Sequence, residues 1–226
     1  MSLATTADAA PKLSVRLQDG TKLAHRAVER HAFLRAIVQG SLDRETYRLY
    51  LRDLLWVYCA LEAALDAHTE HPLLGRIWSQ ALRRAPSLRS DLSYFSDGNS
   101  EGIGDCTEPV SDAAQRFADR LYQLANREPE RLIGHVYTRY LGDLSGGQIL
   151  RGLIVKALAL RDEKGVSFYA FTDIPDPTHW KQRFRLQLDE LALSEQQQQA
   201  VVDEALRSFV LSGELFSARD ALLQMR

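Results

Sequence analysis

The chain has 226 residues, of which 45% are hydrophobic and 26% charged, a balance typical of a globular protein with a sizeable core. Its 28 lysine and arginine residues against 30 aspartate and glutamate residues give a formal charge of −2, which provides no strong field for nucleic acid. No run approaches the roughly 18 apolar residues of a membrane span. We therefore expect neither a nucleic-acid partner nor a membrane.

The two cysteines, Cys59 and Cys106, lie far apart without C-x-x-C spacing. They are too few for a disulfide framework or a thiolate metal site, which fits a reducing compartment. Residues 1–11 lack the basic and apolar stretches of a signal peptide, and we expect them to form a disordered tail. The cytoplasm is the predicted location.

Helical periodicity dominates the chain, and strand signals are scarce. A first helix is predicted over residues 13–38, followed by a turn at Gly40. The next helix carries apolar residues in steps of three and four from Tyr47 to Leu65, with Asp43 as a plausible N-cap. Further helices are predicted over residues 74–82, 110–125, 129–160, 178–192 and 194–216.

Proline and loop residues separate these helices. The chain breaks at His71–Pro72 and again at Pro86. Residues 96–109, rich in Gly, Asp, Ser and Asn, are predicted to form the main surface loop, and residues 164–177 a second one. Neither loop is long enough to separate domains. We therefore expect a single all-α domain over residues 1–226.

The predicted helix that begins at Pro129 is unusual because it contains five glycines: Gly134, Gly142, Gly146, Gly147 and Gly152. Each interior glycine costs about 1 kcal/mol relative to alanine, so their number calls for a local reason. Gly142 and Gly146 are four residues apart and share a face, with Gly147 adjacent. They leave one patch of helix bare and permit a bend there, so a flat ligand could lie on the backbone. Asp143 lies inside this patch.

The segment YTRYLGDLSGGQ, from Tyr137 to Gln148, resembles the signature of the haem oxygenase family. The resemblance extends to the segments KLAHRAVE, WVYCALE, HWKQRFR and FVLSGELF, and it covers most of the chain after about Ser14. It implies an all-α fold in which haem lies between a proximal helix and a kinked, glycine-rich distal helix. The implied reaction opens haem with O₂ and external electrons, giving biliverdin, carbon monoxide and ferrous iron.

The resemblance places the proximal iron ligand at His25. Glu29, four residues later, can bond the imidazole N–H, fix its tautomer and raise its basicity as a ligand. His31 is the nearest rival but lacks the family match. His68 and His71 are three residues apart, yet no third ligand accompanies them.

On the distal side, the resemblance implies that Asp143 does not bind iron. It holds a water network that supplies protons to the reacting oxygen. Tyr58, Arg139 and Tyr137 are its expected polar partners, although Tyr58 could also be an ordinary core residue. Gly142 and Gly146 would lie against the haem.

The two haem propionates need cations. The resemblance assigns this role to Lys22, Lys181 and Arg185, while a solvated basic face is the plainer interpretation. Where many relatives have a further lysine, this chain has Gln18, so the clamp is expected to be weaker. The resemblance also places Phe209 and Phe216 among the apolar residues of the haem pocket. Aromatic residues at this spacing are otherwise ordinary core residues.

The reaction needs repeated reduction of iron, but the chain has no flavin or nicotinamide fingerprint. Electrons must therefore come from a partner, and a ferredoxin or a flavoprotein reductase is the natural donor. Lys22, Arg26 and Arg30 could present it with a basic patch. We expect a monomer.

Two other interpretations stay open. A haem carrier or sensor on the same fold would keep His25 and the propionate cations but would not need the Asp143 network. A di-iron or thiamin-degrading relative is also possible on this fold. Helical di-iron sites usually use Glu-x-x-His pairs, of which this sequence has none, and no spacing supports Cys59 as a nucleophile.

Overall fold

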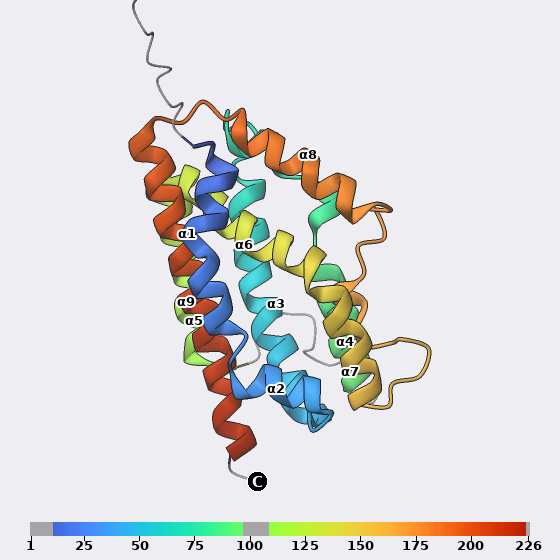
Figure 1. The fold of residues 1–226 in the computed structure, drawn as a ribbon. Helices are drawn as coiled ribbons and strands as arrows, with labels where there is room; N and C mark the ends of the chain where they lie inside the picture. Colours follow the sequence, from blue (N-terminus) through green and yellow to red (C-terminus); the bar gives the residue numbers. More distant parts are fainter. Residues whose placement is uncertain (1–10, 97–108, 225–226) are drawn as a thin grey trace, which may run out of the picture.

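The computed structural model describes residues 11–96 and 109–224, with side chains up to residue 220, and all regular structure in these residues is helical (Figure 1). The predicted all-α fold is confirmed. The α-helices are α1 (Leu13–Val28), α2 (Ala32–Gln39), α3 (Arg44–Asp66), α4 (Ala85–Phe95), α5 (Asp112–Arg127), α6 (Leu132–Ser145), α7 (Gly147–Ala157), α8 (Pro177–Asp189) and α9 (Glu195–Gln224). Short 3₁₀ turns are η1 (Leu74–Arg76), η2 (Gln80–Leu82), η3 (Pro129–Arg131) and η4 (Ser167–Tyr169).

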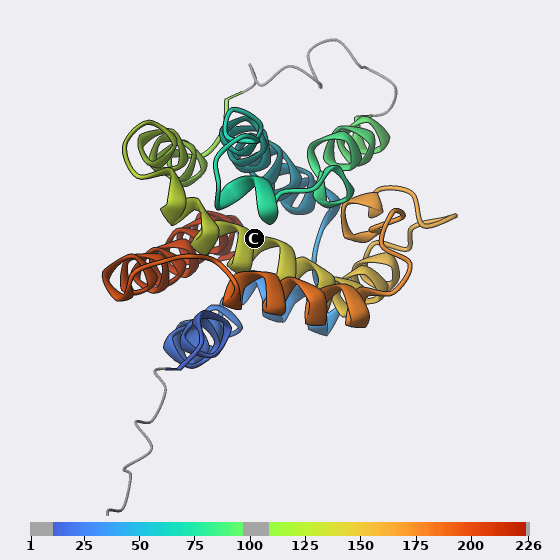
Figure 2. The ribbon, with the colours of Figure 1, turned by 90° about the horizontal axis from the view of Figure 1, so that it is seen from above.

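The helix α6 crosses the middle of the molecule in the view from above, with α1 and α9 on one side and α3 and α4 on the other (Figure 2). α9 packs against α1, α2, α3 and α6, while α3 packs against α4 and α5. Fully buried aromatic side chains fill the core between these layers: Tyr47, Tyr58, Tyr140, Phe33, Phe117, Phe168 and Phe184. Such burial is worth about 1.5–3 kcal/mol for a large apolar side chain, so packing holds the helices around α6.

The predicted signals at the start of α3 are confirmed. The carboxylate of Asp43 accepts a hydrogen bond of 3.0 Å from the Thr46 backbone N–H, which is otherwise unpaired in the first turn. Gly40 ends α2 with a φ of +72°, a left-handed conformation that glycine adopts without steric cost. The predicted tail (residues 1–11) and main loop (residues 96–109), with Cys106, lie almost entirely outside the described residues.

The prediction of one helix over residues 13–38 is wrong, because α1 ends at Val28 and α2 begins at Ala32. His31 between them has extended backbone angles. Asp220 on α9 accepts a hydrogen bond of 2.6 Å from the Phe33 backbone N–H and lies 3.2 Å from the His31 ring. This distant carboxylate therefore caps a new helix, which a local pattern could not reveal.

The predicted helix over residues 74–82 is also wrong, since this stretch forms only the 3₁₀ turns η1 and η2. Ser79 between them is extended and accepts a hydrogen bond from the Ala81 N–H. The true helix here is α4, where Pro86 occupies the first turn instead of ending a helix. Glu62 on α3 accepts hydrogen bonds from the N–H groups of Arg84 and Ala85 at the start of α4.

The glycine-rich stretch bends as predicted, although it is not one helix over residues 129–160. α6 ends at Ser145 and α7 begins at Gly147, and Figure 1 shows α7 turning away from α6. The first three predicted residues form η3. α9 continues to Gln224, beyond the predicted end at Phe216.

Candidate functional site

A cavity of about 490 Å³ lies between α1 and the α6–α7 bend, with α2 and α9 contributing to its walls. A second cavity of about 330 Å³ adjoins it and shares five lining residues with it: His25, Thr138, Gly142, Ser145 and Phe209. Apolar side chains dominate the larger cavity, whereas polar and charged side chains contribute more to the smaller one. Together they form one elongated space with an apolar and a polar end.

The predicted site residues meet around this space. The larger cavity is lined by His25, Glu29, Arg139, Gly142, Asp143, Gly146, Phe209 and Phe216. The smaller cavity is lined by Gln18, Lys22, Tyr137 and Arg185. Tyr58 is fully buried behind Asp143, and Lys181 reaches the rim by donating a hydrogen bond of 3.1 Å to Ser145. Residues from five helices (α1, α3, α6, α8 and α9), far apart in sequence, thus converge on one site.

The glycines of α6 and α7 serve two different purposes. A Cβ atom added at Gly142 would meet nothing within 4 Å, and at Gly146 only the Gly142 carbonyl at 3.7 Å. A Cβ at Gly134 would lie 2.7 Å from the backbone of Ala205, so this glycine allows α6 and α9 to pack closely. A Cβ added at Gly147 would lie 3.0 Å from the Tyr169 ring, which is tighter than ordinary contact. Close packing therefore explains Gly134 and Gly147, whereas Gly142 and Gly146 leave the helix surface bare.

His25 projects from α1 into the same space. Its side chain is 56% exposed, and its Nδ1 lies 3.4 Å from a carboxylate oxygen of Glu29. The ring of Phe209 stands edge-on to the imidazole, with 5.8 Å between the ring centroids. An imidazole held at one nitrogen by a carboxylate presents the other nitrogen as a metal ligand.

Asp143 directly follows Gly142, and hydrogen-bonded side chains hold its carboxylate in place. Tyr58 on α3 donates a hydrogen bond to its carboxylate, and the guanidinium of Arg139 donates one of 3.2 Å to the Tyr58 hydroxyl. Arg139 also donates a hydrogen bond of 3.4 Å to Ser212 on α9. The Asp143 carboxylate is therefore fixed at the edge of the cavity by three helices.

Burial is the main electrostatic influence on this group. It raises the pKa of the Asp143 carboxyl, while the charge of Arg139 and the Tyr58 hydrogen bond partly offset that rise. Burial disfavours the Arg139 charge, yet Tyr58 and Asp143 outweigh burial and raise the pKa of Arg139. Asp143 thus binds a proton more readily than a solvated aspartate, next to a permanent cation.

The other histidines are engaged elsewhere. His31 faces Asp220, and the Nδ1 atom of His68 lies 2.8 Å from the Ala64 carbonyl. Among the described residues, no group of three or more His, Cys, Asp or Glu side chains could hold a metal ion. Of the described histidines, only His25 is among the residues that line the two cavities. It is therefore the candidate iron ligand.

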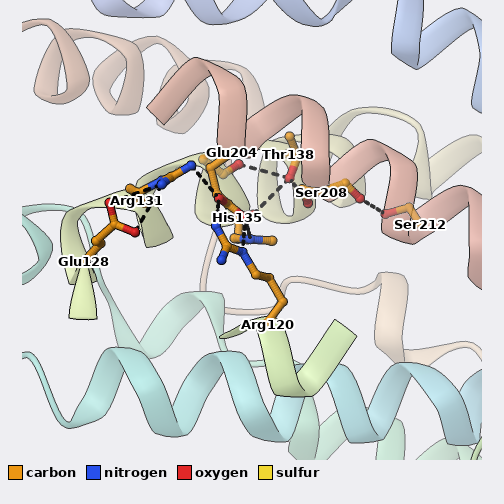
Figure 3. Close-up of polar contacts among 9 residues, drawn as sticks. Arg120, Glu128, Arg131, His135, Thr138, Glu204, Ser208 and Ser212 are labelled. Atoms are coloured by element: carbon orange, nitrogen blue, oxygen red, sulfur yellow. Dashed lines mark hydrogen bonds and ion pairs between the residues drawn. The ribbon is translucent and has the colours of Figure 1, made fainter. Parts of the chain in front are cut away.

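A polar seam between α6 and α9 begins with buried charges (Figure 3). Glu204 is 1% exposed and accepts hydrogen bonds from Arg120, while Arg131 lies 3.1 Å from it. The Nε2 atom of His135 lies 3.1 Å from the same carboxylate. Burial alone would raise the pKa of Glu204, but its hydrogen bonds with His135 and Arg120 outweigh burial and lower that pKa to about 2.

The seam continues as hydroxyl groups of α6 and α9 (Figure 3). The hydroxyls of Thr138 and Ser208 lie 2.6 Å apart, and Ser212 donates a hydrogen bond of 2.8 Å to the Ser208 carbonyl. Ser212 accepts the Arg139 bond, so the seam links the α6–α9 contact to Asp143. Sequence reasoning missed Ser212, although it lies within the segment FVLSGELF.

Sequence reasoning also missed the apolar end of the larger cavity. Leu34 and Val38 from α2 line this end together with Leu150 and Leu153 from α7. Their spacing suits ordinary packing as well as a ligand wall, so no sequence signal separates the two.

None of the helices within residues 11–96 and 109–224 combines the length and the hydropathy of a membrane span.

Comparison with known proteins decides the family. The profile described as "Heme oxygenase" matches residues 11–218. The chain belongs to the haem oxygenase family. Heme oxygenase 1 of Nostoc sp. is 38% identical over 205 residues, covering 90% of this chain and 84% of the relative. Heme oxygenase of the alga Porphyra purpurea is 38% identical over 204 residues, covering 90% and 85%.

Solved haem oxygenases share the fold. Heme oxygenase-1 of Synechocystis, in complex with heme, has a TM-score of 0.87 and 34% identity, covering 92% of each chain. Heme oxygenase-2 of Synechocystis, in complex with heme and NO, has a TM-score of 0.90 and 35% identity, covering 95% of this chain and 88% of its own. A thiaminase-like protein of Sulfolobus solfataricus, with 18% identity and a TM-score of 0.60, shares the fold alone.

Proposed function

We propose that this haem oxygenase family member binds haem between α1 and α6 and opens the ring with O₂ and external electrons. The products are biliverdin, carbon monoxide and ferrous iron. One observation carries the proposal: the imidazole of His25 and the bare backbone at Gly142 border the same two cavities. The heme-bound structures of the Synechocystis relatives support it.

The residues around the cavities fit haem. The apolar cavity suits the porphyrin, the polar cavity suits the propionates, and Gly142 has open space in front of it. His25, with Glu29 at its Nδ1 atom, would bind the iron of the haem through its other ring nitrogen. Bound haem supplies the iron that activates O₂ and the ring carbon that is oxidised.

Asp143 is the residue to which we assign proton delivery. Its carboxylate borders the cavity, its pKa is raised by burial, and Tyr58 and Arg139 fix its orientation. A carboxyl group that acts through water can pass protons to the reacting oxygen without crowding it. A haem carrier has no use for this arrangement, so turnover is favoured over storage.

The cations of the smaller cavity hold the propionates. Lys22 and Arg185 line it directly, and Lys181 is anchored at Ser145 on its rim. Tyr137 lines the same cavity, where burial raises the pKa of its hydroxyl. Gln18 lines the same cavity at the position where many relatives have a lysine, so the propionate clamp of this chain has one cation fewer than theirs.

Electrons arrive from a partner, for which we propose a ferredoxin or a flavoprotein reductase. Lys22 and Arg26 on α1 and Arg30 just after its end are exposed cations close to His25 in the sequence, and they suit an acidic donor. We place the reaction in the cytoplasm and assign the enzyme as a monomer. Salt titration of the reduction rate tests the donor surface, because screening weakens such attraction.

A single-turnover experiment tests the function. The purified chain is mixed with one equivalent of hemin in air, with ascorbate or a ferredoxin–reductase pair and an iron chelator. Loss of the Soret band with a broad red biliverdin absorption is the expected result. Hemin that binds through histidine yet stays intact with both reductants would identify a carrier or sensor. Hemin that does not bind would exclude the assignment of His25.

A further inference from the structure

A separate cavity of about 180 Å³ lies between α8 and the segment of η1 and η2. It shares no lining residue with the two cavities of the candidate site. Two tryptophans and two arginines line it, together with an isoleucine, a serine and a glutamine. An apolar cavity of roughly 150 Å³ can hold a benzene molecule, so this one has room for a single aromatic ring with a small substituent.

The helix α8 presents different residues to this cavity and to the candidate site. Trp180, Arg183 and Gln187 line the separate cavity, and their spacing of three and four residues places them on one face of α8. Lys181 and Arg185 lie on the nearly opposite face, towards the smaller cavity of the candidate site. The propionate clamp therefore leaves a whole face of α8 without an assigned role.

The aromatic walls of the separate cavity are held in place by their own neighbours. Trp180 stacks on the buried ring of Phe184, with 5.0 Å between the ring centroids and 14° between the ring planes. Trp78 is 9% exposed, and its indole N–H donates a hydrogen bond of 2.9 Å to Asp66. The guanidinium of Arg83 lies over the Trp78 ring, 5.5 Å from its centroid. A flat apolar group can thus pack against indoles that are already fixed.

The two arginines of this cavity differ in their partners. Arg76 donates hydrogen bonds of 3.2 and 3.3 Å to the carbonyl and the carboxylate of Glu190. The side-chain amide of Gln187 donates one of 3.3 Å to the Arg76 carbonyl. Arg183 is exposed and forms no hydrogen bond or ion pair with another described residue. No acidic side chain of the described residues lines the cavity, so the Arg183 guanidinium is available to an anion.

We propose that this cavity binds a small aromatic carboxylate, with its ring against Trp78 and Trp180 and its carboxylate on Arg183. The volume admits one ring, and the indoles provide an apolar surface for it. The planar guanidinium can donate two parallel hydrogen bonds to a carboxylate, which a neutral ring could not accept. This binding site goes beyond the proposed function, because it shares no residue with the haem-facing cavities.

Benzoate is the probe, and the indole N–H signals of the ¹⁵N-labelled chain report where it binds. The chain has three tryptophans, and Trp56 on α3 lies outside the cavity as an internal reference. Benzoate should shift the signals of Trp78 and Trp180 in a saturable way and leave that of Trp56 in place. Trp180→Phe identifies the Trp180 signal. We expect a dissociation constant on the order of 1 mM, as is usual for a ligand of so few atoms.

Two arginine variants of α8 test the recognition of the carboxylate. Arg183→Gln should weaken benzoate binding about tenfold, because it removes the charge-assisted hydrogen bonds. Arg185→Gln is the matched control, since it removes an exposed arginine from the opposite face of the same helix and should leave benzoate affinity unchanged. Benzamide has the same shape without the charge, so it should bind wild type more weakly than benzoate does and should not distinguish wild type from Arg183→Gln.

Three results would overturn the proposal. The first is the absence of any shift in the Trp78 and Trp180 signals at benzoate concentrations well above the expected dissociation constant. The second is a loss of benzoate binding in Arg185→Gln but not in Arg183→Gln, which would place benzoate at the haem-facing cavity. The third is inorganic phosphate producing the same shifts at the same concentrations, which would identify a general anion site. None of these measurements uses haem, so their outcome is distinct from that of the single-turnover experiment.

Discussion

The phenol of Tyr58 donates its hydrogen bond to Asp143 while accepting one from Arg139, so a single hydroxyl joins the buried cation to the cavity carboxylate. These residues come from α3 and α6, and Ser212 on α9 completes the set by accepting from Arg139. Because each partner is held by the next, the position of Asp143 depends on how three helices pack. The chemistry at the cavity is therefore sensitive to residues that never touch a ligand.

Replacing Asp143 with Asn should separate hemin binding from ring opening. The amide keeps the shape of the side chain and a partner for Tyr58 but loses the acidic group, so hemin affinity should change little while the ring-opening rate falls about 100-fold or more. Absorbance titration measures the first and single turnover the second. Tyr58→Phe, which leaves the carboxylate in place, should show a smaller loss. Full turnover by Asp143→Asn contradicts the assigned role.

Replacing His25 with Ala should remove the axial ligand without unfolding the protein, since this side chain is 56% exposed. The hemin complex should lose its histidine-ligated spectrum, and added imidazole should restore both spectrum and turnover by entering the gap beside Glu29. His31→Ala is the comparison variant, because its ring faces Asp220 outside the cavity. A wild-type spectrum in His25→Ala would show that another group binds the iron.

The sequence signals that succeeded were local ones. The Asp43 cap and the bend at the glycine-rich segment follow from backbone chemistry within a few residues, and the structure confirms both. The spacing of Gly142 and Gly146 indicated a bare patch, and a Cβ would meet nothing within 4 Å at Gly142 and only a backbone carbonyl at 3.7 Å at Gly146. The roles of the site residues came from the family resemblance, and the structure adds that they share one space.

The features that the sequence did not predict depend on contacts between residues that are distant in sequence. The break between α1 and α2 is set by Asp220, almost the whole chain away. The start of α4 is capped by Glu62 from α3, whereas the periodic residues before it form only 3₁₀ turns. Ser212 accepts a hydrogen bond from Arg139 only because α9 packs against α6 at this point. Such contacts are long-range and leave no periodic pattern.

Substitution of two glycines by alanine should have opposite effects. Gly142→Ala should stabilise the fold by up to about 1 kcal/mol, because its Cβ meets open space, but should weaken hemin binding several-fold. Gly134→Ala should destabilise the fold by about 1–3 kcal/mol, since its Cβ would lie 2.7 Å from the α9 backbone. Urea unfolding and hemin titration measure the two effects. Unchanged hemin affinity in Gly142→Ala would place the ligand elsewhere.

Gln18→Lys should strengthen the propionate clamp. Gln18 lines the polar cavity with Lys22 and Arg185, so a lysine there adds a cation at its rim. A charge-assisted hydrogen bond to one propionate is worth about 1.5–3 kcal/mol when well formed and less when exposed, so hemin affinity should rise up to about tenfold at low salt. Titration at two salt concentrations measures the gain. A gain that high salt does not reduce would indicate packing, not charge.

Glu204→Gln should show how the α6–α9 seam depends on pH. The folded pKa of Glu204 is about 2, below its value near 4.3 in an unfolded chain, so the carboxylate stabilises the fold above about pH 5, and this stabilisation is lost as pH falls towards 2. The variant should therefore be less stable than wild type by about 2–3 kcal/mol at pH 7, with the gap narrowing in acid. Glu214→Gln, which breaks an exposed pair with Arg116, should cost under about 1 kcal/mol. Urea unfolding at pH 7 and pH 3 tests both, and a constant gap would mean that the Glu204 charge is not what holds the seam.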